Sequence, residues 1–432
     1  GFPRRAPSRK RGVSSRGPRV DPAIEGLCGH EARTSLGIGV PASVTNVSHH
    51  RDALIDRAAA ADSACGVFAE ASPRLRRLIP FDSAIWLATD PAAAMPTAPT
   101  RKENLTGFDV NDCVTVWERE FLVEDVNAYQ ELAHREIPAA GLRVSTGDRP
   151  ARSGRYRKFL RPHGLGDEMR FVCRIDGAPW AWVSLFREAG RPAFTERDAE
   201  FLGGLSEPLA AALREHARPG VGAPMPREAH GPGLMLFAPD GSLLSINDEA
   251  RAWLDEFPPI WDDGDLITGK VDNRFGIDLP ILVVGALMRA RAIAEERDFG
   301  PARARMRSPS TGRWLVCHAS CMRNDDGSVG NTALVIEPAK ASEIAPIIAQ
   351  AYELSRREQE ITQLIAQGLG TAAIAERLFL SVHTVRDYVK TIFDKVGVSS
   401  RGELVAKLFA EHYAPTHVDP ANVESTLFTP SY

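Results

Sequence analysis

The sequence has no hydrophobic run long enough to cross a membrane. Its longest apolar stretch, residues 279–288, ends at Arg289, whereas a spanning helix needs about 20 apolar residues. The N-terminal residues are basic but no apolar segment follows them, so a secretory signal is not expected either. These absences predict a cytoplasmic protein without a membrane partner.

Cysteine is also scarce, with six residues in 432, too few and too scattered for a disulfide framework. Only Cys317 and Cys321, with His318 between them, are close enough to suggest a metal site. The surrounding segment, WLVCHASC, alternates as a strand does, and zinc sites usually have more ligands in tighter pairs. We therefore expect thiols in a hydrophobic core, and neither a metal nor a cofactor.

An excess of positive charge is missing as well. The formal net charge is −4, which by itself does not indicate a nucleic-acid partner. Residues 1–20 hold basic but no acidic side chains, among proline, glycine and serine, so residues 1–50 are predicted to form a disordered tail. A chain of 432 residues, 44% of them hydrophobic, has room for about three globular domains.

Two α+β modules are predicted upstream of residue 341. In the first, residues 51–216, a helical pattern and the strand SAIWLATD precede a hairpin that turns at Asp176-Gly177, and a helix capped by Thr195 closes the module. Proline and glycine mark residues 217–232 as a linker. In the second module, residues 233–340, two hairpins flank short helices.

Everything after residue 341 has helical periodicity, with a connecting helix over 341–352, four helices over 353–413 and a tail over 414–432. Ser355 and Glu358 form a capping box, and that helix stops at Gly368. Thr371 and Ser381 are predicted to cap the second and third helices. Ser400 and Glu403 form another capping box at the start of the fourth helix.

The third helix of this set is amphipathic. Its inner face is predicted to hold Val382, Val385, Val389, Ile392, Phe393 and Val396. Its outer face carries Thr384, Arg386, Asp387, Lys390, Thr391 and Lys395. Two short helices joined by a tight turn, the second with a polar and partly cationic face, predict a helix-turn-helix that enters a DNA major groove.

Two glycine patterns have the spacing of nucleotide-binding loops, but neither has the sequence context that such a loop needs. Gly368, Gly370 and Ala373 have dinucleotide-loop spacing, but an amphipathic helix precedes them where that motif needs a strand. In GDLITGKV, residues 264–271, Gly264, Gly269 and Lys270 resemble a P-loop, but Val271 stands where magnesium needs serine or threonine. No ATPase or other enzymatic activity is expected.

The C-terminal segment LSRREQEITQLIAQGLGTAAIAERLFLSVHTVRDYVKTIFDKVGVSSRGELV resembles the LuxR-type (GerE/FixJ-like) DNA-binding domain along its whole length. The resemblance implies dimers that read DNA with the third helix, which begins after Ser381. It implies that Arg386, Asp387 and Lys390 face base edges, and that Thr384 and Lys395 approach phosphates. Tyr388 and Ala373 depart from the family pattern.

Both upstream modules also resemble known domains. The stretch around RPHGLGDEMRFVCRIDGAPWAW resembles GAF-type sensor domains of actinobacterial regulators, and LMLFAPDGSLLSINDEARAWL resembles the opening of a PAS-like domain. Trp180 and Trp182 suit either a small-molecule pocket or a core. His163 with Asp167 and Glu168 suits acid–base chemistry or, more simply, a hydrogen-bonded turn.

The predicted fold class is multidomain: two α+β sensor-like domains, GAF-like and PAS-like, followed by an all-α four-helix helix-turn-helix domain. The predicted function is a transcription regulator, a homodimer on a palindromic operator in double-stranded DNA, controlled by an unknown small-molecule signal. A cytoplasmic, nucleoid-associated location follows. The alternative is a cofactor- or small-molecule-binding redox sensor, or an enzyme, with DNA binding secondary.

Overall fold

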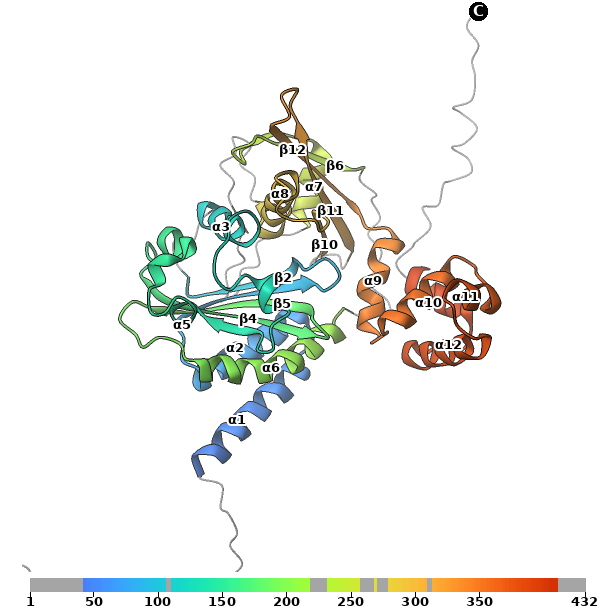
Figure 1. Ribbon diagram of the computed structural model, residues 1–432, viewed down its shortest axis with the longest axis horizontal. Helices are drawn as coiled ribbons and strands as arrows, with labels where there is room; N and C mark the ends of the chain where they lie inside the picture. The colour runs from blue at the N-terminus through green and yellow to red at the C-terminus, as the bar shows by residue number, and fades with distance from the viewer. Residues whose placement is uncertain are drawn as a thin grey trace, which may run out of the picture. The chain divides into compact units, whose positions relative to one another are not determined.

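The computed structural model describes residues 42–105, 110–217, 231–256, 268–269, 279–308 and 313–410 (Figure 1). Gly264, Lys270 and Val271 of the P-loop-like segment lie outside these residues, as do residues 218–230 of the predicted linker. Helix α1 (Ala42–Ala59) begins inside the stretch assigned to the N-terminal tail, so that prediction was too long at its C-terminal end. Among the described residues, no helix is both long and apolar enough to span a bilayer.

The first sheet has five strands in the order β2-β1-β5-β4-β3, and every neighbouring pair is antiparallel. The predicted hairpin is confirmed, because Asp176 and Gly177 both have positive φ, as a two-residue hairpin turn of the favoured hand requires. The strands are β1 (Ser83–Asp90), β2 (Met95–Glu103), β3 (Ala139–Gly141), β4 (Leu165–Ile175) and β5 (Ala178–Glu188).

Both faces of this sheet are covered, which is why all residues of β1 are buried. On one face Trp86 and Phe171 pack with α1, α2 (Ala64–Leu78) and α6 (Glu196–Glu215), and Figure 1 shows α2 and α6 beneath β4. Thr195 and Asp198 form the capping box of α6, and Thr195 is its cap as predicted. On the other face Trp182 and Phe186 pack with α3 (Val110–Trp117), α4 (Tyr129–Leu132), α5 (Leu142–Ser145) and the π turns Glu118–Leu122 and Tyr156–Leu160.

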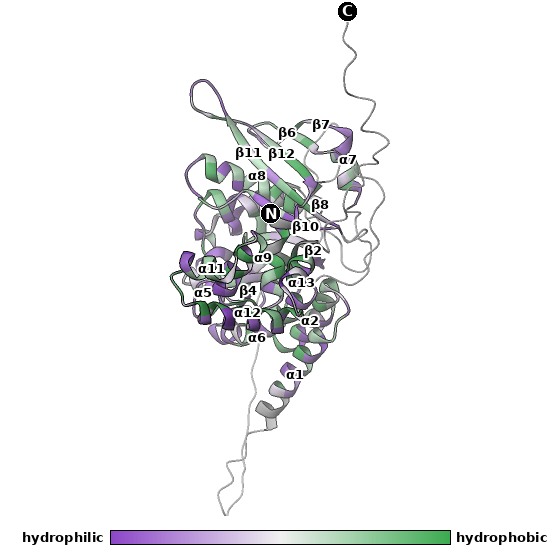
Figure 2. Ribbon diagram, turned by 90° about the vertical axis from the view of Figure 1, so that its right-hand side faces the viewer, coloured by the Kyte–Doolittle hydropathy of each residue, from purple (hydrophilic) through white to green (hydrophobic). Residues whose placement is uncertain are grey.

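The second sheet is also antiparallel, with the order β10-β11-β12-β6-β7. Its strands are β6 (Gly233–Phe237), β7 (Leu243–Ile246), β10 (Arg303–Arg307), β11 (Trp314–Arg323) and β12 (Val329–Pro338), and Figure 2 shows hydrophobic residues along β6, β11 and β12. Helices α7 (Asp248–Asp255) and α8 (Ile281–Ala294) belong to this module, beside the short pair β8 (Thr268–Gly269) and β9 (Leu279–Pro280).

Cys317 and Cys321 lie on β11, in the strand that the sequence predicts. Burial raises the pKa of the Cys317 thiol, and the Cys321 Sγ lies 3.1 Å from Thr332 Oγ1. His318 faces Glu343 instead, with its Nε2 3.3 Å from the carboxylate. In the described part of the chain, no three His, Cys, Asp or Glu side chains converge as metal ligands, and the absence of a metal stays a prediction.

The two sheets share one hydrophobic cluster, which the sequence analysis did not anticipate. Trp182 of the first sheet and Phe237 and Ile336 of the second belong to it. Polar contacts cross the same boundary: Arg305 Nη1 lies 2.6 Å from Asp90 Oδ2, and Arg289 Nη1 donates to the Ala93 carbonyl at 2.6 Å. The two upstream modules are therefore packed against each other through buried side chains.

Residues 341–410 form a small all-helical core. Its helices are α9 (Ala341–Ala351), α10 (Arg356–Ala366), α11 (Thr371–Arg377), α12 (Val382–Val396) and α13 (Arg401–Val405), and α13 continues into the π turn Ala406–Ala410. Ile361, Ile374, Val385 and Leu404 are fully buried within this core. Each of the four predicted helices thus contributes a side chain to one common interior.

Candidate nucleic-acid interface

Helix α12 is bounded by local sequence signals at both ends. The Ser381 hydroxyl accepts a hydrogen bond from the Thr384 amide at 3.0 Å, which confirms Ser381 as the cap. At the other end Gly397 has a left-handed conformation with φ of 69°, which glycine adopts without steric cost. The helix length is therefore set before any partner binds.

The inner face of α12 is close to the prediction. Val385, Ile392 and Val396 are buried, and Val389 and Phe393 are partly buried against the same core. Val382 is a correction, because it is 39% exposed. It is the first residue of the helix and lies before the first buried position, so the packing of α10 and α11 does not reach it.

The outer face presents most of the predicted DNA-binding residues to solvent. Arg386, Asp387 and Lys390 are exposed, and Thr384 is half-buried beside the Ser381 cap. His383 was not predicted as a site residue, and its Nδ1 lies 2.9 Å from Asp387 Oδ2. This pair could have been predicted from the sequence, because residues four apart on a helix are neighbours on its surface.

Lys395 has a structural role that the sequence analysis did not foresee. Its Nζ donates to the Glu353 carbonyl at 2.9 Å and to Glu358 Oε2 at 2.8 Å. Burial raises the pKa of Glu358, but hydrogen bonds from Lys395 and from the Ser355 amide outweigh it and lower the pKa. Lys395 thus ties α12 to the confirmed Ser355–Glu358 capping box, and its predicted phosphate contact stays untested.

The turn between α10 and α11 differs from the prediction in one residue. Gly368 has φ of 83° and ends α10 as expected. Gly370, not Thr371, occupies the cap position of α11, because Thr371 is already its first helical residue. The Thr371 hydroxyl instead accepts from Arg401 Nη2 at 2.8 Å, and Arg401 Nη1 donates to the Leu369 carbonyl at 2.8 Å. These glycines therefore join two helices.

At α13 one of the two hydrogen bonds of the predicted capping box is confirmed. The Ser400 hydroxyl accepts from the Glu403 amide at 3.1 Å, as a cap does. The Glu403 carboxylate, however, accepts from the Ser399 amide at 2.8 Å, so the reciprocal bond is shifted by one residue.

The acid–base candidates of the first module do not form one site. His163 Nε2 lies 2.9 Å from Asp112 Oδ2. Asp167 accepts from the backbone amides of Phe194, Arg143 and Glu168. Glu168 pairs with two buried arginines instead of His163. Three separate structural contacts replace the suggested constellation.

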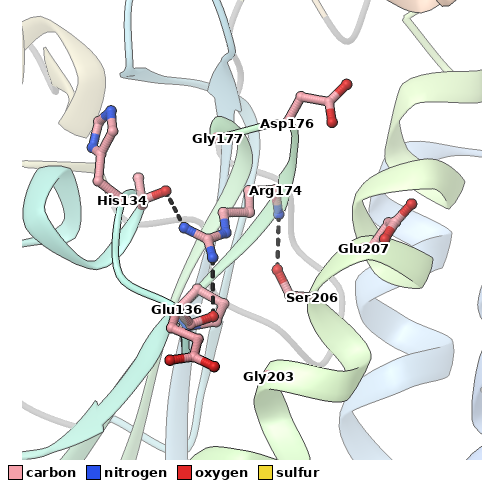
Figure 3. A pocket seen from close by; sticks show the side chains of 10 residues that line it. His134, Glu136, Arg174, Asp176, Gly177, Gly203, Ser206 and Glu207 are labelled. Atoms are coloured by element: carbon pink, nitrogen blue, oxygen red, sulfur yellow. Dashed lines mark hydrogen bonds between the residues drawn. The ribbon is translucent and has the colours of Figure 1, made fainter.

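Among the described residues, two hollows are large enough for a small molecule. One of about 420 Å³ lies beside the β4–β5 turn (Figure 3), but Arg174 there donates to the carbonyls of Ala133 and Glu136 and so is committed to backbone. Another of about 410 Å³ is lined by Trp180 and Arg307. Trp182 is a core residue, stacked on Tyr129 with 4.8 Å between ring centroids.

Comparison with known proteins concerns the C-terminal helices. Residues 352–408 match the family described as bacterial regulatory proteins, luxR family. The oxygen regulatory protein NreC of Staphylococcus aureus (strain JH9) is 52% identical over 52 residues, which are 12% of this chain and 24% of NreC. The chain thus spans about a quarter of the length of this relative.

Two solved structures of VqmA from Vibrio cholerae are also similar. One, a complex with ligand and DNA, is 18% identical with a TM-score of 0.19 and covers 41% of this chain and 80% of VqmA. The other, a dimer in the absence of target DNA, is 17% identical with a TM-score of 0.18 and covers 41% of this chain and 81% of VqmA. The family match and the capped, glycine-linked helices identify the C-terminal region of this chain as a LuxR-type helix-turn-helix domain.

Proposed function

We propose that this protein is a transcription regulator that binds double-stranded DNA sequence-specifically through α12. The observation that carries the proposal is the exposed row of Arg386, Asp387 and Lys390 on a helix held by caps and core on its other side. A second helix of this kind is the element that enters a major groove. The 52% identity of these helices to a regulatory protein supports the same assignment.

Each side chain of the row has a chemical role in the proposal. Arg386 pairs with guanine O6 and N7, and Asp387, oriented by His383, accepts from cytosine N4. Lys390 faces the same groove, while Thr384 and the start of the helix approach phosphate. We place Lys395 in the scaffold, because both of its bonds are to α10 and the segment before it.

Replacing Arg386 by Ala is expected to weaken binding to the preferred duplex by about 1–3 kcal/mol and to relax selectivity at one base pair. The preferred duplex is obtained by genome-wide mapping of binding sites, and affinities are measured at fixed salt concentration. Arg356→Ala, which removes the same charge from an exposed site on α10, is the matched control. Equal losses on all sequences for Arg386→Ala would show that Arg386 contacts phosphate only.

The protein is expected to bind its operator as a homodimer on a palindromic site. Residues 353–413 hold eight basic and eight acidic side chains, so general attraction to phosphate is weak and a single copy of the domain binds poorly. Sedimentation of the free protein and of its complex with the duplex measures this directly. A monomer in both states contradicts the proposal.

The upstream GAF-like and PAS-like modules are proposed to sense a small molecule and to bias the DNA-reading helices, a coupling between two sites. The hollow lined by Trp180 and Arg307 is the candidate site for that molecule. A cytoplasmic, nucleoid-associated location goes with this role. The alternative is a cofactor- or small-molecule-binding redox sensor, or an enzyme, with DNA binding secondary. Colour in the purified protein would favour a bound cofactor, and a featureless spectrum above the aromatic band would count against it.

A further inference from the structure

Four helices of the C-terminal core end in the same backbone motif, and one of them, α11, ends on an aromatic residue. Amides donate to the carbonyl five residues earlier in Leu354→Ala349, Leu369→Leu364, Leu380→Ala375 and Val398→Phe393, the bond that closes a left-handed helix end. The residue before each donor has positive φ. At two ends it is glycine, Gly368 and Gly397, and at the other two it is Glu353 and Phe379, with φ of 58° and 56°.

Phe379 is unfavourable at this position for two reasons. A side chain strains a left-handed backbone, which glycine adopts freely at Gly368 and Gly397. The ring is also 96% exposed, so it gains no burial against the described residues. Both effects oppose a phenylalanine at this position unless a partner buries the ring.

Val382 is the second exposed apolar residue at this end of α12, at 39%. It lies four residues before Arg386 and eight before Lys390, so the three side chains follow one row along the helix. Val382 therefore continues the proposed reading face to the N-terminus of α12, and Phe379 lies three residues earlier, in the turn before the helix. We call these two exposed residues the apolar edge. The N-terminal residues of a recognition helix are those that reach base edges.

We propose that the apolar edge packs against thymine methyl groups in the major groove and so selects thymine at one end of the recognition sequence. The thymine methyl is the one apolar group that base pairs present there, and apolar side chains recognise it. Continuity with the row of Arg386 and Lys390 favours DNA as the occupant. The inference rests on the proposed DNA-binding function.

The test uses the full chain, a duplex selected by it from a random library, and the same duplex with deoxyuridine replacing one thymine at a time. The wild type is expected to lose affinity about fourfold for each contacted methyl group. Val382→Ala and Phe379→Gly are expected to bind the thymine duplex more weakly and to show a smaller or no further loss with deoxyuridine. Phe299→Ala removes a ring that is 90% exposed in the second module and is expected to change neither value.

Folding does not confound the test, because glycine suits φ of 56° and the melting temperature of Phe379→Gly is expected to stay equal or rise. If the ratio of affinities for the thymine and deoxyuridine duplexes is the same in both variants as in the wild type, this inference is wrong, while the proposed function is unaffected. If a variant loses affinity equally for every duplex and its sedimentation changes, the apolar edge is a contact between subunits, and the inference is again wrong. Failure of the wild type to select any sequence overturns both this inference and the proposed function.

Discussion

Replacing Glu168 by Gln is expected to lower the free energy of unfolding by about 3–5 kcal/mol, because it leaves buried guanidinium charge without its partner. Glu168 Oε2 accepts from Arg155 Nε at 2.7 Å, and Oε1 accepts from Arg170 Nε at 3.1 Å and from the Ser184 hydroxyl at 2.7 Å. The Glu168, Arg155 and Arg170 side chains are almost completely buried.

The substitution removes the carboxylate that Arg155 and Arg170 share. Arg170 Nη1 still pairs with Glu120 at 2.9 Å, and the Arg170 Cζ lies 4.3 Å from the centre of the Tyr129 ring. Urea unfolding followed by tryptophan fluorescence measures the loss. Glu131→Gln, which breaks the exposed pair with Arg135, is the matched control and is expected to have little effect. Equal effects of the two variants contradict the expectation.

The same variant gives a pH signature. Burial raises the pKa of the Glu168 carboxyl, but the neighbouring arginines and the Ser184 hydroxyl outweigh burial and lower it from 4.5 to about 2. Because the pKa of the folded state is the lower one, the carboxylate stabilises the fold above about pH 4.5, and this contribution is lost as the pH falls towards 2. Glu168→Gln is expected to flatten the stability profile in that window.

Replacing Asp90 by Ala is expected to cost about 3–5 kcal/mol as well, because it leaves the Arg305 guanidinium buried and unpaired. The pair joins the first sheet to β10 at 2.6 Å, and Asp90 also accepts from the Ala92 amide at 2.9 Å. Thermal or urea unfolding of the whole chain is the measurement. If the first module of Asp90→Ala unfolds in a separate transition, with the same stability as in the wild type, the two modules do not depend on each other.

Two further variants separate the ion pair from general damage. Glu295→Ala removes an acid from the more exposed pair with Arg297, at 3.2 Å, and is expected to leave stability nearly unchanged. The double variant Asp90→Ala with Arg305→Met carries no unpaired charge, so it is expected to recover part of the lost stability. If the double variant recovers no stability, the loss comes from the missing hydrogen bonds between Asp90 and the backbone of the β1–β2 turn.

Local signals explain the part of the structure that sequence reasoning predicted. Ser381, Thr195 and the Ser355–Glu358 box cap helices through bonds to residues three positions away, and the Asp176-Gly177 turn closes its hairpin through its own backbone angles. Such contacts depend on short sequence separation, so their residue types and spacing suffice to find them.

Contacts between distant residues were not predictable in the same way. Lys395 was predicted to be one more cation on a polar helix face, yet its ammonium group binds the Glu358 carboxylate of α10. Glu168 reads as an acid near His163, yet it pairs with Arg155 and Arg170. Thr371 reads as a cap, but the helix begins at that residue and Arg401 binds its hydroxyl.

By itself, then, the sequence determined the helix-turn-helix at the C-terminus, because caps, glycine turns and a helical period are all encoded within a few residues of each other. The tertiary structure decided which polar residues remain available to a partner and which serve the scaffold. It also decided that the two upstream sheets share a core, since Asp90 and Arg305 meet only when strands far apart in the chain pack together.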